Sequence, residues 1–198
     1  MDVKMRVIGP VQANCYILNG RIMIDPGDGV NELDAFIRDS GARIDSVVLT
    51  HGHFDHMLGA AHIKKKYGAK IYVSAADAHC LTDERSALVL PFAAGRFEPC
   101  EADVLLNEGK VTISGTEFEV LLTPGHTEGG LCLLSREDRL IFTGDTLFSN
   151  GYGRTDLPGG DINKLFASLR RLLKLPEDYY VYPGHGEGAL IGEIRGGL

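Results

Sequence analysis

The sequence predicts an α/β fold with two facing β-sheets and helices on their outer sides. In the first half of the 198-residue chain, strand-like runs alternate with runs whose apolar side chains recur at helical spacing. In the second half, five short strand-like runs follow one another, separated by glycine, asparagine or charged residues. Two facing sheets covered by helices would bury all of these apolar runs in a chain of this length.

The first half reads as strands and helices in alternation. Asn19-Gly20 between two strand-like runs is a strong hairpin signal, and the segment 25–29 (Asp-Pro-Gly-Asp-Gly) ends this group of strands. Apolar residues at helical spacing predict a helix from Val30 to about Ser40-Gly41 and another over Gly59–Tyr67. The expected strands are Met5–Ile8, Cys15–Leu18, Arg21–Ile24, Ser46–Leu49 and Lys70–Val73.

The second half is mostly strands. Before it, Ser74–Pro99 gives the weakest pattern: Ala75–Leu81 fits a short helix, and Ala87–Arg96 fits a loop or a lid over a site. An amphipathic stripe over Ile162–Leu173, with Asp161 before it, predicts a helix. The sequence contains no repeat, low-complexity tract or linker, so one domain is expected. The expected strands are Val104–Leu106, Val111–Ile113, Glu117–Leu122, Leu131–Leu134, Leu140–Phe142 and Tyr179–Tyr182.

Composition argues against several classes of protein. A net charge of −7 disfavours a nucleic-acid-binding surface, and the run 64–66 (Lys-Lys-Lys) is interpreted as a solvated helix face. The four cysteines are widely spaced and predict neither a disulfide framework nor a zinc ribbon. No signal-peptide pattern and no apolar run near the ~18 residues of a membrane span occur. We expect a reduced, cytoplasmic protein that binds neither nucleic acid nor membrane, and its oligomeric state is not predicted.

The segment Thr50–His56, which reads Thr-His-Gly-His-Phe-Asp-His, carries four potential metal ligands directly after an apolar run. Imidazole and carboxylate groups suit zinc, iron or manganese. His51 and His53 lie on the same side of an extended or turning backbone, so Asp55 and His56 must point elsewhere. Because one ion cannot easily take all four, the spacing suggests two metal ions that share one short loop.

Three further ligand candidates each follow a strand-like run in the second half. His126 lies in Thr-Pro-Gly-His-Thr, Asp145 in Thr-Gly-Asp-Thr and His185 in Pro-Gly-His-Gly. The glycine in each motif permits a tight turn and a close approach of the backbone. Ligands at the ends of adjacent strands converge on one edge of a sheet, where a rigid scaffold holds them.

Taken in this order, the four motifs resemble the metallo-β-lactamase-fold superfamily, specifically its small glyoxalase II-like metallohydrolases (hydroxyacylglutathione hydrolase-like proteins). The resemblance extends from the turn at Asp25 to His185. It implies an αββα sandwich of two facing mixed β-sheets with outer helices. Residues 1–198 would form a single domain of this kind, without the helical C-terminal domain that glyoxalase II adds.

The resemblance also implies a ligand set and a mechanism. Two divalent metal ions are expected as cofactors, with zinc favoured and iron or manganese as alternatives. A hydroxide that bridges both ions would attack an acyl carbonyl. Asp55 and Asp145 are the catalytic candidates, with Asp55 also handling a proton. By motif, His51, His53 and His126 would hold one ion, Asp55, His56 and His185 the other, and Asp145 would bridge both through its two oxygens.

Outside the ligand motifs, Asp25 is the candidate for holding a metal-bound histidine by a hydrogen bond. The alternative is that Asp25 stabilises its own Pro-Gly turn, and both roles are compatible. His62 and His79 fall in helix-like segments without a motif and are interpreted as surface or packing residues.

The segment Phe148–Asp156 resembles the Gly-x-Gly-Arg-x-Asp stretch of small bacterial glyoxalase II-like proteins and of persulfide dioxygenases. By this resemblance Arg154 and Tyr152 are substrate-binding candidates, because a guanidinium suits a substrate carboxylate. For Arg154, a salt bridge to Asp156 or a nearby acid is an equal alternative. Leu88–Phe97 and the Tyr152–Arg154 loop are the expected walls of the substrate pocket.

The predicted function is therefore a dinuclear metal-dependent hydrolase of thioesters, with S-lactoylglutathione as the typical substrate of the family. Because the chain ends soon after His185, other small-molecule thioesters or esters also fit. The alternative is a mononuclear Fe(II) persulfide dioxygenase, which shares most of these positions.

Four other readings are disfavoured. True β-lactamases are secreted and typically place a cysteine or similar ligand where Asp145 stands, and the flavodiiron branch has an acidic residue in place of His53. RNA-processing members carry added domains and basic surfaces. A metal-binding module without activity is the least favoured, because all seven ligand positions are intact.

Overall fold

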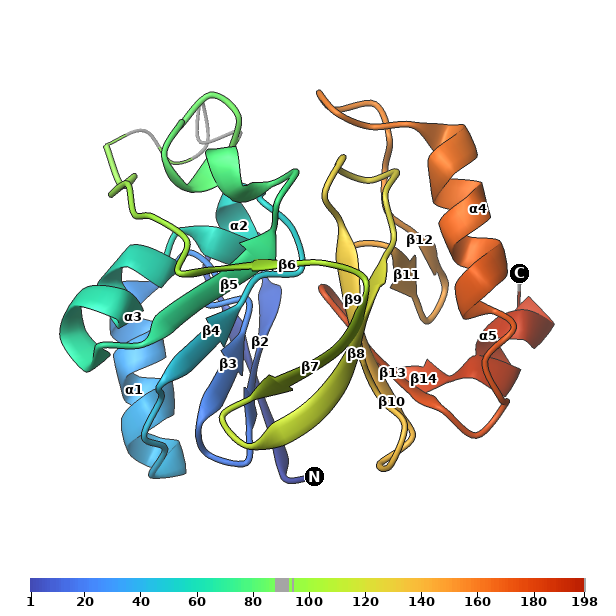
Figure 1. Cartoon of the computed structure of the whole chain (residues 1–198), viewed down its shortest axis with the longest axis horizontal. Coiled ribbons are helices and arrows are strands. Elements are labelled where there is room, and N and C mark those ends of the chain that lie inside the picture. Colours follow the sequence, from blue (N-terminus) through green and yellow to red (C-terminus); the bar gives the residue numbers. More distant parts are fainter. Residues whose placement is uncertain (88–92, 94, 198) are drawn as a thin grey trace. The chain divides into compact units, whose positions relative to one another are not determined.

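The computed structural model of the chain describes residues 1–87, 93 and 95–197. The chain falls into two compact units, Met1–Leu106 and Asn107–Leu198. Each unit contains one mixed six-stranded β-sheet with helices (Figure 1). The predicted α/β class with two mixed sheets is confirmed. That the whole chain forms a single domain stays a prediction.

The sheet of the first unit has the strand order β1-β2-β3-β4-β5-β6. The first three strands pair in antiparallel fashion, and each later strand is parallel to its neighbour. The strands are β1 (Val3–Ile8), β2 (Ala13–Leu18), β3 (Ile22–Ile24), β4 (Ser46–Val48), β5 (Lys70–Ser74) and β6 (Val104–Leu106). The helices are α1 (Val30–Ser40), α2 (Phe54–Met57), α3 (Ala60–Tyr67) and a 3₁₀-helix (Ala78–Leu81).

The predicted strands and the two long helices of this unit are confirmed, with ends displaced by at most two residues. Gly41 and Gly68 end α1 and α3 in the left-handed conformation, which glycine adopts without strain. The helix expected over Ala75–Leu81 is wrong in its first half, since only a 3₁₀ turn over the second half forms. Helix α2 was not predicted. Most of the loop expected at Ala87–Arg96 lies outside the described residues.

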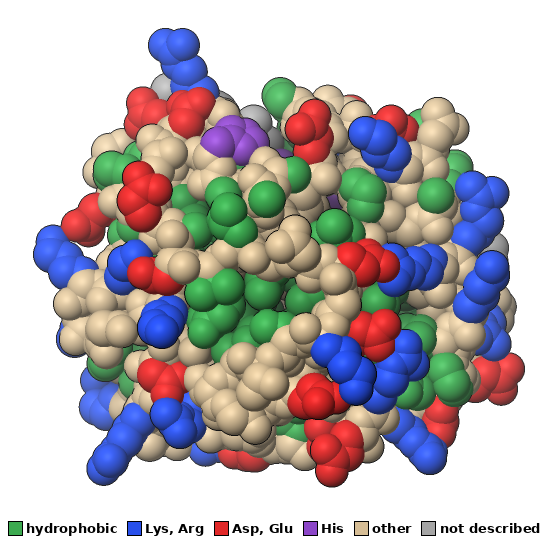
Figure 2. All heavy atoms as spheres, in the orientation of Figure 1, with side chains coloured by type: hydrophobic (Ala, Val, Ile, Leu, Met, Phe, Trp, Pro, Cys, Tyr) green, Lys and Arg blue, Asp and Glu red, His purple; other side chains and the backbone are tan. Residues whose placement is uncertain are grey.

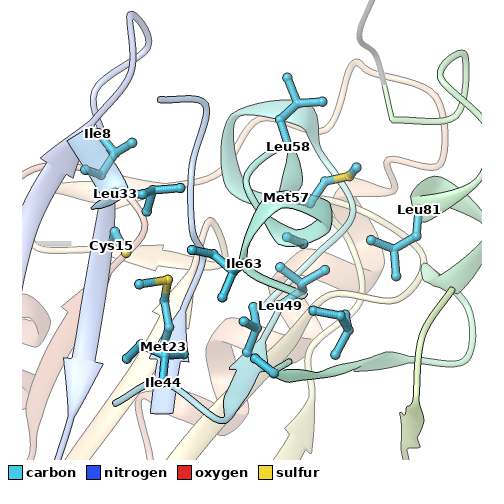
Figure 3. Packing of buried hydrophobic residues seen from close by; sticks show 14 of the residues in the cluster. Ile8, Cys15, Met23, Leu33, Ile44, Leu49, Met57, Leu58, Ile63 and Leu81 are labelled. Carbon is cyan, nitrogen blue, oxygen red and sulfur yellow. The ribbon is translucent and has the colours of Figure 1, made fainter. Parts of the chain in front are cut away.

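Helices α1 and α3 lie side by side on one face of the first sheet (Figure 1). Their apolar stripes pack against strand residues in one buried cluster. Figure 3 shows Leu33 of α1, Ile63 of α3 and Met23 of β3 in this cluster, together with Leu49 and Met57. Because Leu49 and Met57 flank the segment Thr50–His56, the cluster anchors both ends of the expected ligand loop.

Asp34 on α1 joins the two helices by accepting three hydrogen bonds from α3. The donors are His62 Nε2 at 2.9 Å, Lys66 Nζ at 2.6 Å and the Tyr67 hydroxyl at 2.9 Å. Burial alone would raise the pKa of Asp34, but the three hydrogen bonds outweigh it and lower the pKa to about 2.

This cluster predicts a loss of stability in acid. The folded pKa of Asp34 lies below the unfolded value of about 3.9, so its contribution is complete above pH 4 and is lost as the pH falls towards 2. In urea unfolding at about pH 5 and about pH 3, Asp34→Asn should be less stable than wild type at pH 5 and lose less stability on acidification. Asp39→Asn, which breaks an exposed pair with Arg6, is the control. Equal acid losses in wild type and Asp34→Asn would contradict the prediction.

Acidic and basic side chains are mixed on the face of the molecule shown in Figure 2. On the face seen in Figure 2, Lys and Arg side chains lie among Asp and Glu side chains rather than in one basic field. The lysine run on α3 follows this pattern, because each lysine pairs with a carboxylate. The pairs are Lys64 with Asp103, Lys65 with Glu98 and Lys66 with Asp34.

The sheet of the second unit has the strand order β14-β13-β10-β9-β8-β7, in which β10 and β13 are parallel and the other pairs antiparallel. The strands are β7 (Gly109–Ile113), β8 (Thr116–Leu122), β9 (Leu131–Ser135), β10 (Leu140–Gly144), β13 (Tyr180–Pro183) and β14 (Ala189–Leu190). A separate hairpin consists of β11 (Leu147–Phe148) and β12 (Gly151–Tyr152), and the helices are α4 (Ile162–Leu172) and α5 (Ile191–Gly197).

Helix α4 packs its apolar stripe on one face of this sheet, next to α5 (Figure 1). Asp161 caps its N-terminus, since Asp161 Oδ1 accepts hydrogen bonds from the backbone N–H groups of Asn163 and Lys164. The six strands expected after Pro99 are confirmed, and so is helix α4. The short β11–β12 hairpin and strand β14 were not predicted. Within the described part of the chain, no helix has the length and apolar character needed to span a membrane.

Candidate metal centre

In the first unit, two parallel neighbouring strands deliver acidic and histidine side chains to the same edge of the sheet. Asp25 follows β3 directly, and Thr50 and His51 follow β4. Asp25 is buried and adopts a positive φ of 48°. Its Oδ1 accepts the Thr50 backbone N–H at 2.8 Å, and its Oδ2 accepts the Thr50 hydroxyl at 2.6 Å. The contact with Thr50 ties the two strand ends together.

Asp25 also sets the protonation pattern of two histidines. His56 Nδ1 lies 2.9 Å from Asp25 Oδ2. A carboxylate only accepts, so the proton sits on Nδ1 and the His56 Nε2 carries the lone pair. The Thr50 hydroxyl gives its single proton to Asp25, so it accepts from His51 Nδ1 at 3.1 Å. The His51 Nε2 therefore carries a lone pair as well, which is the form that a metal ion binds.

The donors of the first unit are packed closely. The His51 ring lies 4.9 Å from the His53 ring and 4.2 Å from the His56 ring, measured between centroids. His56 Nε2 and Asp55 Oδ2 are 3.6 Å apart. Donor atoms of Asp25, His51 and His56 also lie within 4.8 Å of one another. Because Asp25 is already at hydrogen-bond distance from His56, we assign it as the partner of that histidine rather than as a ligand.

The backbone of the ligand loop is held from outside its own motif. Gly52 N–H donates to Asp77 Oδ2 at 3.0 Å, and Asp77 is buried. A Cβ at Gly52 would lie 2.5 Å from the sulfur of Cys80, so a side chain there would push the loop away. Phe54 N–H donates to the Ala87 carbonyl. Asp77 was missed at the sequence level, because it follows β5 without any motif.

In the second unit, three strands that run in the same direction end at the same edge of the sheet. His126 follows β8, Asp145 follows β10 and His185 follows β13. Asp145 Oδ2 lies 3.6 Å from His126 Nε2 and 3.6 Å from His185 Nε2. The same carboxylate oxygen faces both rings, whereas the family resemblance implies a bridge through both oxygens of Asp145.

These spacings fit donors around a metal ion. A separation of 3.6 Å is too long for a hydrogen bond. Two donors that are each about 2.1 Å from one ion lie about 3.4 Å apart at a tetrahedral angle. The same 3.6 Å separates Asp55 Oδ2 from His56 Nε2 in the first unit. Each unit thus presents His and Asp side chains whose donor atoms lie at separations that fit two ligands of one divalent cation.

The segment directly after β12 and helix α4 both lie against residues of the His126 loop. His126 Nδ1 lies 2.8 Å from the Arg154 carbonyl oxygen, which only accepts, so the lone pair again sits on Nε2. A Cβ at Gly153 would overlap the Asp145 carbonyl oxygen, and one at Gly125 would overlap the backbone of Leu165. Both positions require glycine because the backbones approach so closely.

The side chain of Arg154 forms a two-point pair with Asp156, at 2.7 and 2.6 Å. These hydrogen bonds lower the pKa of Asp156 to about 2. The exposed Tyr152 packs edge-to-face on Phe166, with ring centroids 5.5 Å apart. Substrate binding by Arg154 and Tyr152 stays a prediction. Most of the other expected pocket wall, Leu88–Phe97, lies outside the described residues.

The two remaining histidines have hydrogen-bond partners outside the set of candidate metal ligands. His62 bonds to Asp34, as described above, and the exposed His79 donates from Nδ1 to the Ala76 carbonyl at 2.8 Å. Both contacts fit the surface or packing role expected of them.

Comparison with known proteins places this arrangement in a family. The model of the Metallo-beta-lactamase superfamily matches residues 8–185. The Hydroxyacylglutathione hydrolase GloC of Haemophilus influenzae is 33% identical, and the match covers 98% of this chain and 95% of that protein.

Solved structures agree with the sequence matches. The crystal structure of BLEG-1 B3 metallo-beta-lactamase has a TM-score of 0.91 at 32% identity, covering 97% of this chain and 95% of that one. The crystal structure of TTHA1623 in a di-iron-bound form has a TM-score of 0.86 at 35% identity, covering 96% of each chain. The predicted fold is therefore confirmed, and the chain belongs to the metallo-β-lactamase superfamily.

Proposed function

We propose that this protein is a metal-dependent hydrolase that cleaves thioesters with the help of two divalent ions. The observation that carries the proposal is the position of Asp145, whose Oδ2 lies 3.6 Å from the Nε2 atoms of His126 and His185. A carboxylate oxygen between two imidazoles suits a ligand shared by two ions. The proposed donors are His51, His53, Asp55, His56, His126, Asp145 and His185.

Divalent ions held by these donors would supply Lewis-acid chemistry, bringing the pKa of water near neutrality and polarising an acyl carbonyl. Hydrogen bonds within the protein hold several histidines in the tautomer that binds a metal ion. Asp25, Thr50 and the Arg154 carbonyl each engage an Nδ1–H group, so three histidines present Nε2 lone pairs. In the hydrolysis, the water oxygen forms a bond to the acyl carbon and the C–S bond breaks. We assign to the Asp55 carboxylate the transfer of the water proton to the departing thiolate.

A glutathione thioester is the substrate class that we propose. A relative named as a hydroxyacylglutathione hydrolase aligns over 95% of its own length. A protein of that name therefore has nearly the same length as this chain. This likeness supports a glutathione thioester as substrate, and S-lactoylglutathione is the first substrate to test.

The test pairs elemental analysis of the purified protein with S-lactoylglutathione hydrolysis on the same sample. We expect about two metal ions per chain, turnover that is lost after chelation, and recovery when zinc, iron or manganese is restored. Full turnover by metal-free protein would contradict the proposal.

Two other activities are measured on the same sample. A single iron per chain with oxygen uptake on glutathione persulfide would replace the proposal by a dioxygenase. A chromogenic β-lactam is included because a structure named as a B3 metallo-β-lactamase is so similar. β-Lactam turnover without thioester cleavage would overturn the proposed substrate class but not the metal site.

A further inference from the structure

Two buried threonines join the loop that carries His126 to the loop that carries Asp145. Thr123 precedes His126 by three residues, and Thr146 follows Asp145 directly. Their hydroxyl oxygens lie 3.0 Å apart, and neither residue is more than 3% exposed. Strand β9 lies between β8 and β10, so no backbone ladder joins the two loops. The hydroxyl pair is therefore a direct link between strand ends that the sheet leaves separate.

The link continues through Cys132 of β9 into the turn before Asp145. Cys132 Sγ lies 3.3 Å from Thr123 Oγ1 and donates to the Thr143 carbonyl at 3.8 Å. Burial raises the pKa of Cys132 to about 12, so the thiol keeps its proton. Thr143 also accepts the Thr146 backbone N–H at 3.0 Å, and its hydroxyl donates to the Leu147 carbonyl at 2.7 Å.

The Thr143 carbonyl, at the end of this series of hydrogen bonds, fixes which group donates in each of them. The Thr143 carbonyl only accepts, so the Cys132 S–H points towards it. The Thr123 hydroxyl then donates to the Cys132 sulfur and accepts from the Thr146 hydroxyl. Each hydroxyl or thiol group thus has one orientation. A buried hydrogen-bond network in which every group has a partner holds its residues rigidly.

We propose that Thr123, Cys132 and Thr146 are positioning residues that set the distance between His126 Nε2 and Asp145 Oδ2. The inference rests on the proposed function only in treating these two atoms as metal donors. Valine has nearly the shape of threonine, and replacing both partners of a buried hydrogen bond by apolar groups is often nearly neutral for stability. The hydroxyls therefore affect the spacing of the donors more than the stability of the fold.

The test compares two double variants of the full chain. Thr123→Val with Thr146→Val removes the link but keeps its shape, and Thr123→Ser with Thr146→Ser keeps the hydroxyls. The affinity of metal-free protein for Zn²⁺ is measured by competition with a chromophoric chelator, and the Co²⁺ form is examined by absorption. We expect affinity to fall about 10- to 100-fold in the valine variant and to stay near wild type in the serine variant. The Tm of the metal-free valine variant should lie within about 5 °C of wild type.

Thr112→Val, an exposed change on β7 of the same sheet, is the control and should alter neither measurement. Wild-type Zn²⁺ affinity and an unchanged Co²⁺ spectrum in the valine variant would overturn the inference. If that variant does not fold, the single changes Thr146→Val and Thr146→Ser make the same comparison. Reduced affinity in a protein that shows no thioester hydrolysis would support the positioning role and refute the proposed substrate. Wild-type Zn²⁺ affinity in the valine variant, together with normal thioester hydrolysis, would refute the positioning role and support the proposed substrate.

Discussion

Replacement of Asp145 by alanine is expected to remove most of the bound metal and to lower thioester hydrolysis by about 10³-fold or more. Its Oδ2 faces the Nε2 atoms of both His126 and His185, so one substitution weakens two donor groups at once. The fold should survive, because the close contact with Gly153 involves the Asp145 backbone carbonyl, which alanine retains.

Three measurements on the same sample check this result: metal content by elemental analysis, Tm by circular dichroism, and the initial rate on S-lactoylglutathione. Asp178→Ala, which removes an exposed partner of Arg139 in the same unit, is the matched control and should change none of them. A metal-depleted Asp145→Ala protein that still hydrolyses the thioester at the wild-type rate would refute the metal-dependent mechanism.

Asp25→Asn should cause the second largest loss of metal affinity and hydrolysis, because it changes which ring nitrogen carries the proton in two histidines. An amide offers one oxygen and one NH₂ group, and only the oxygen can accept the Thr50 backbone N–H. The NH₂ group then faces Thr50 Oγ1 and His56 Nδ1, where the carboxylate accepted from both. His56 must accept at Nδ1 and move its proton to Nε2, and the Thr50 hydroxyl turns its proton towards His51. Both rings would lose the lone pair that binds metal.

We expect zinc affinity to fall by about 10- to 100-fold and hydrolysis by about 10²- to 10⁴-fold, as for other carboxylate-to-amide changes behind a functional histidine. Nitrogen-15 NMR of the ring nitrogens in metal-free protein would show Nδ1–H tautomers in wild type and Nε2–H tautomers in the variant. Asp45→Asn, at an exposed pair with Arg21, provides the comparison. Loss of affinity with unchanged tautomers would assign the effect to the charge of Asp25 instead.

The elements and donor positions that sequence could predict share one property, which is local patterning. Strand β8 alternates polar and apolar residues over positions 117–120, and β10 begins with an apolar run. Each is followed by a motif in which a glycine precedes His126 or Asp145. The β11–β12 hairpin has two residues in each strand, too few to display alternation, and α2 is a single turn inside the ligand loop.

The supporting contacts could not be predicted because they join residues that are distant in sequence. Asp77 reaches Gly52 only because β4 and β5 pair in parallel after a helical crossover. Thr123 meets Thr146 over a third strand, which no local pattern reveals. The proton positions on the histidines likewise depend on such partners, so they follow from the folded structure and not from composition or spacing.

The main chain and the side chain of Arg154 have different surroundings. His126 bonds to the Arg154 carbonyl, whereas the exposed guanidinium pairs with Asp156. Any amino acid at this position supplies the same carbonyl. A substitution at position 154 should therefore change the exposed side chain and keep the hydrogen bond that orients His126. The expected contact of the Arg154 side chain with substrate can thus be tested separately from the support of His126.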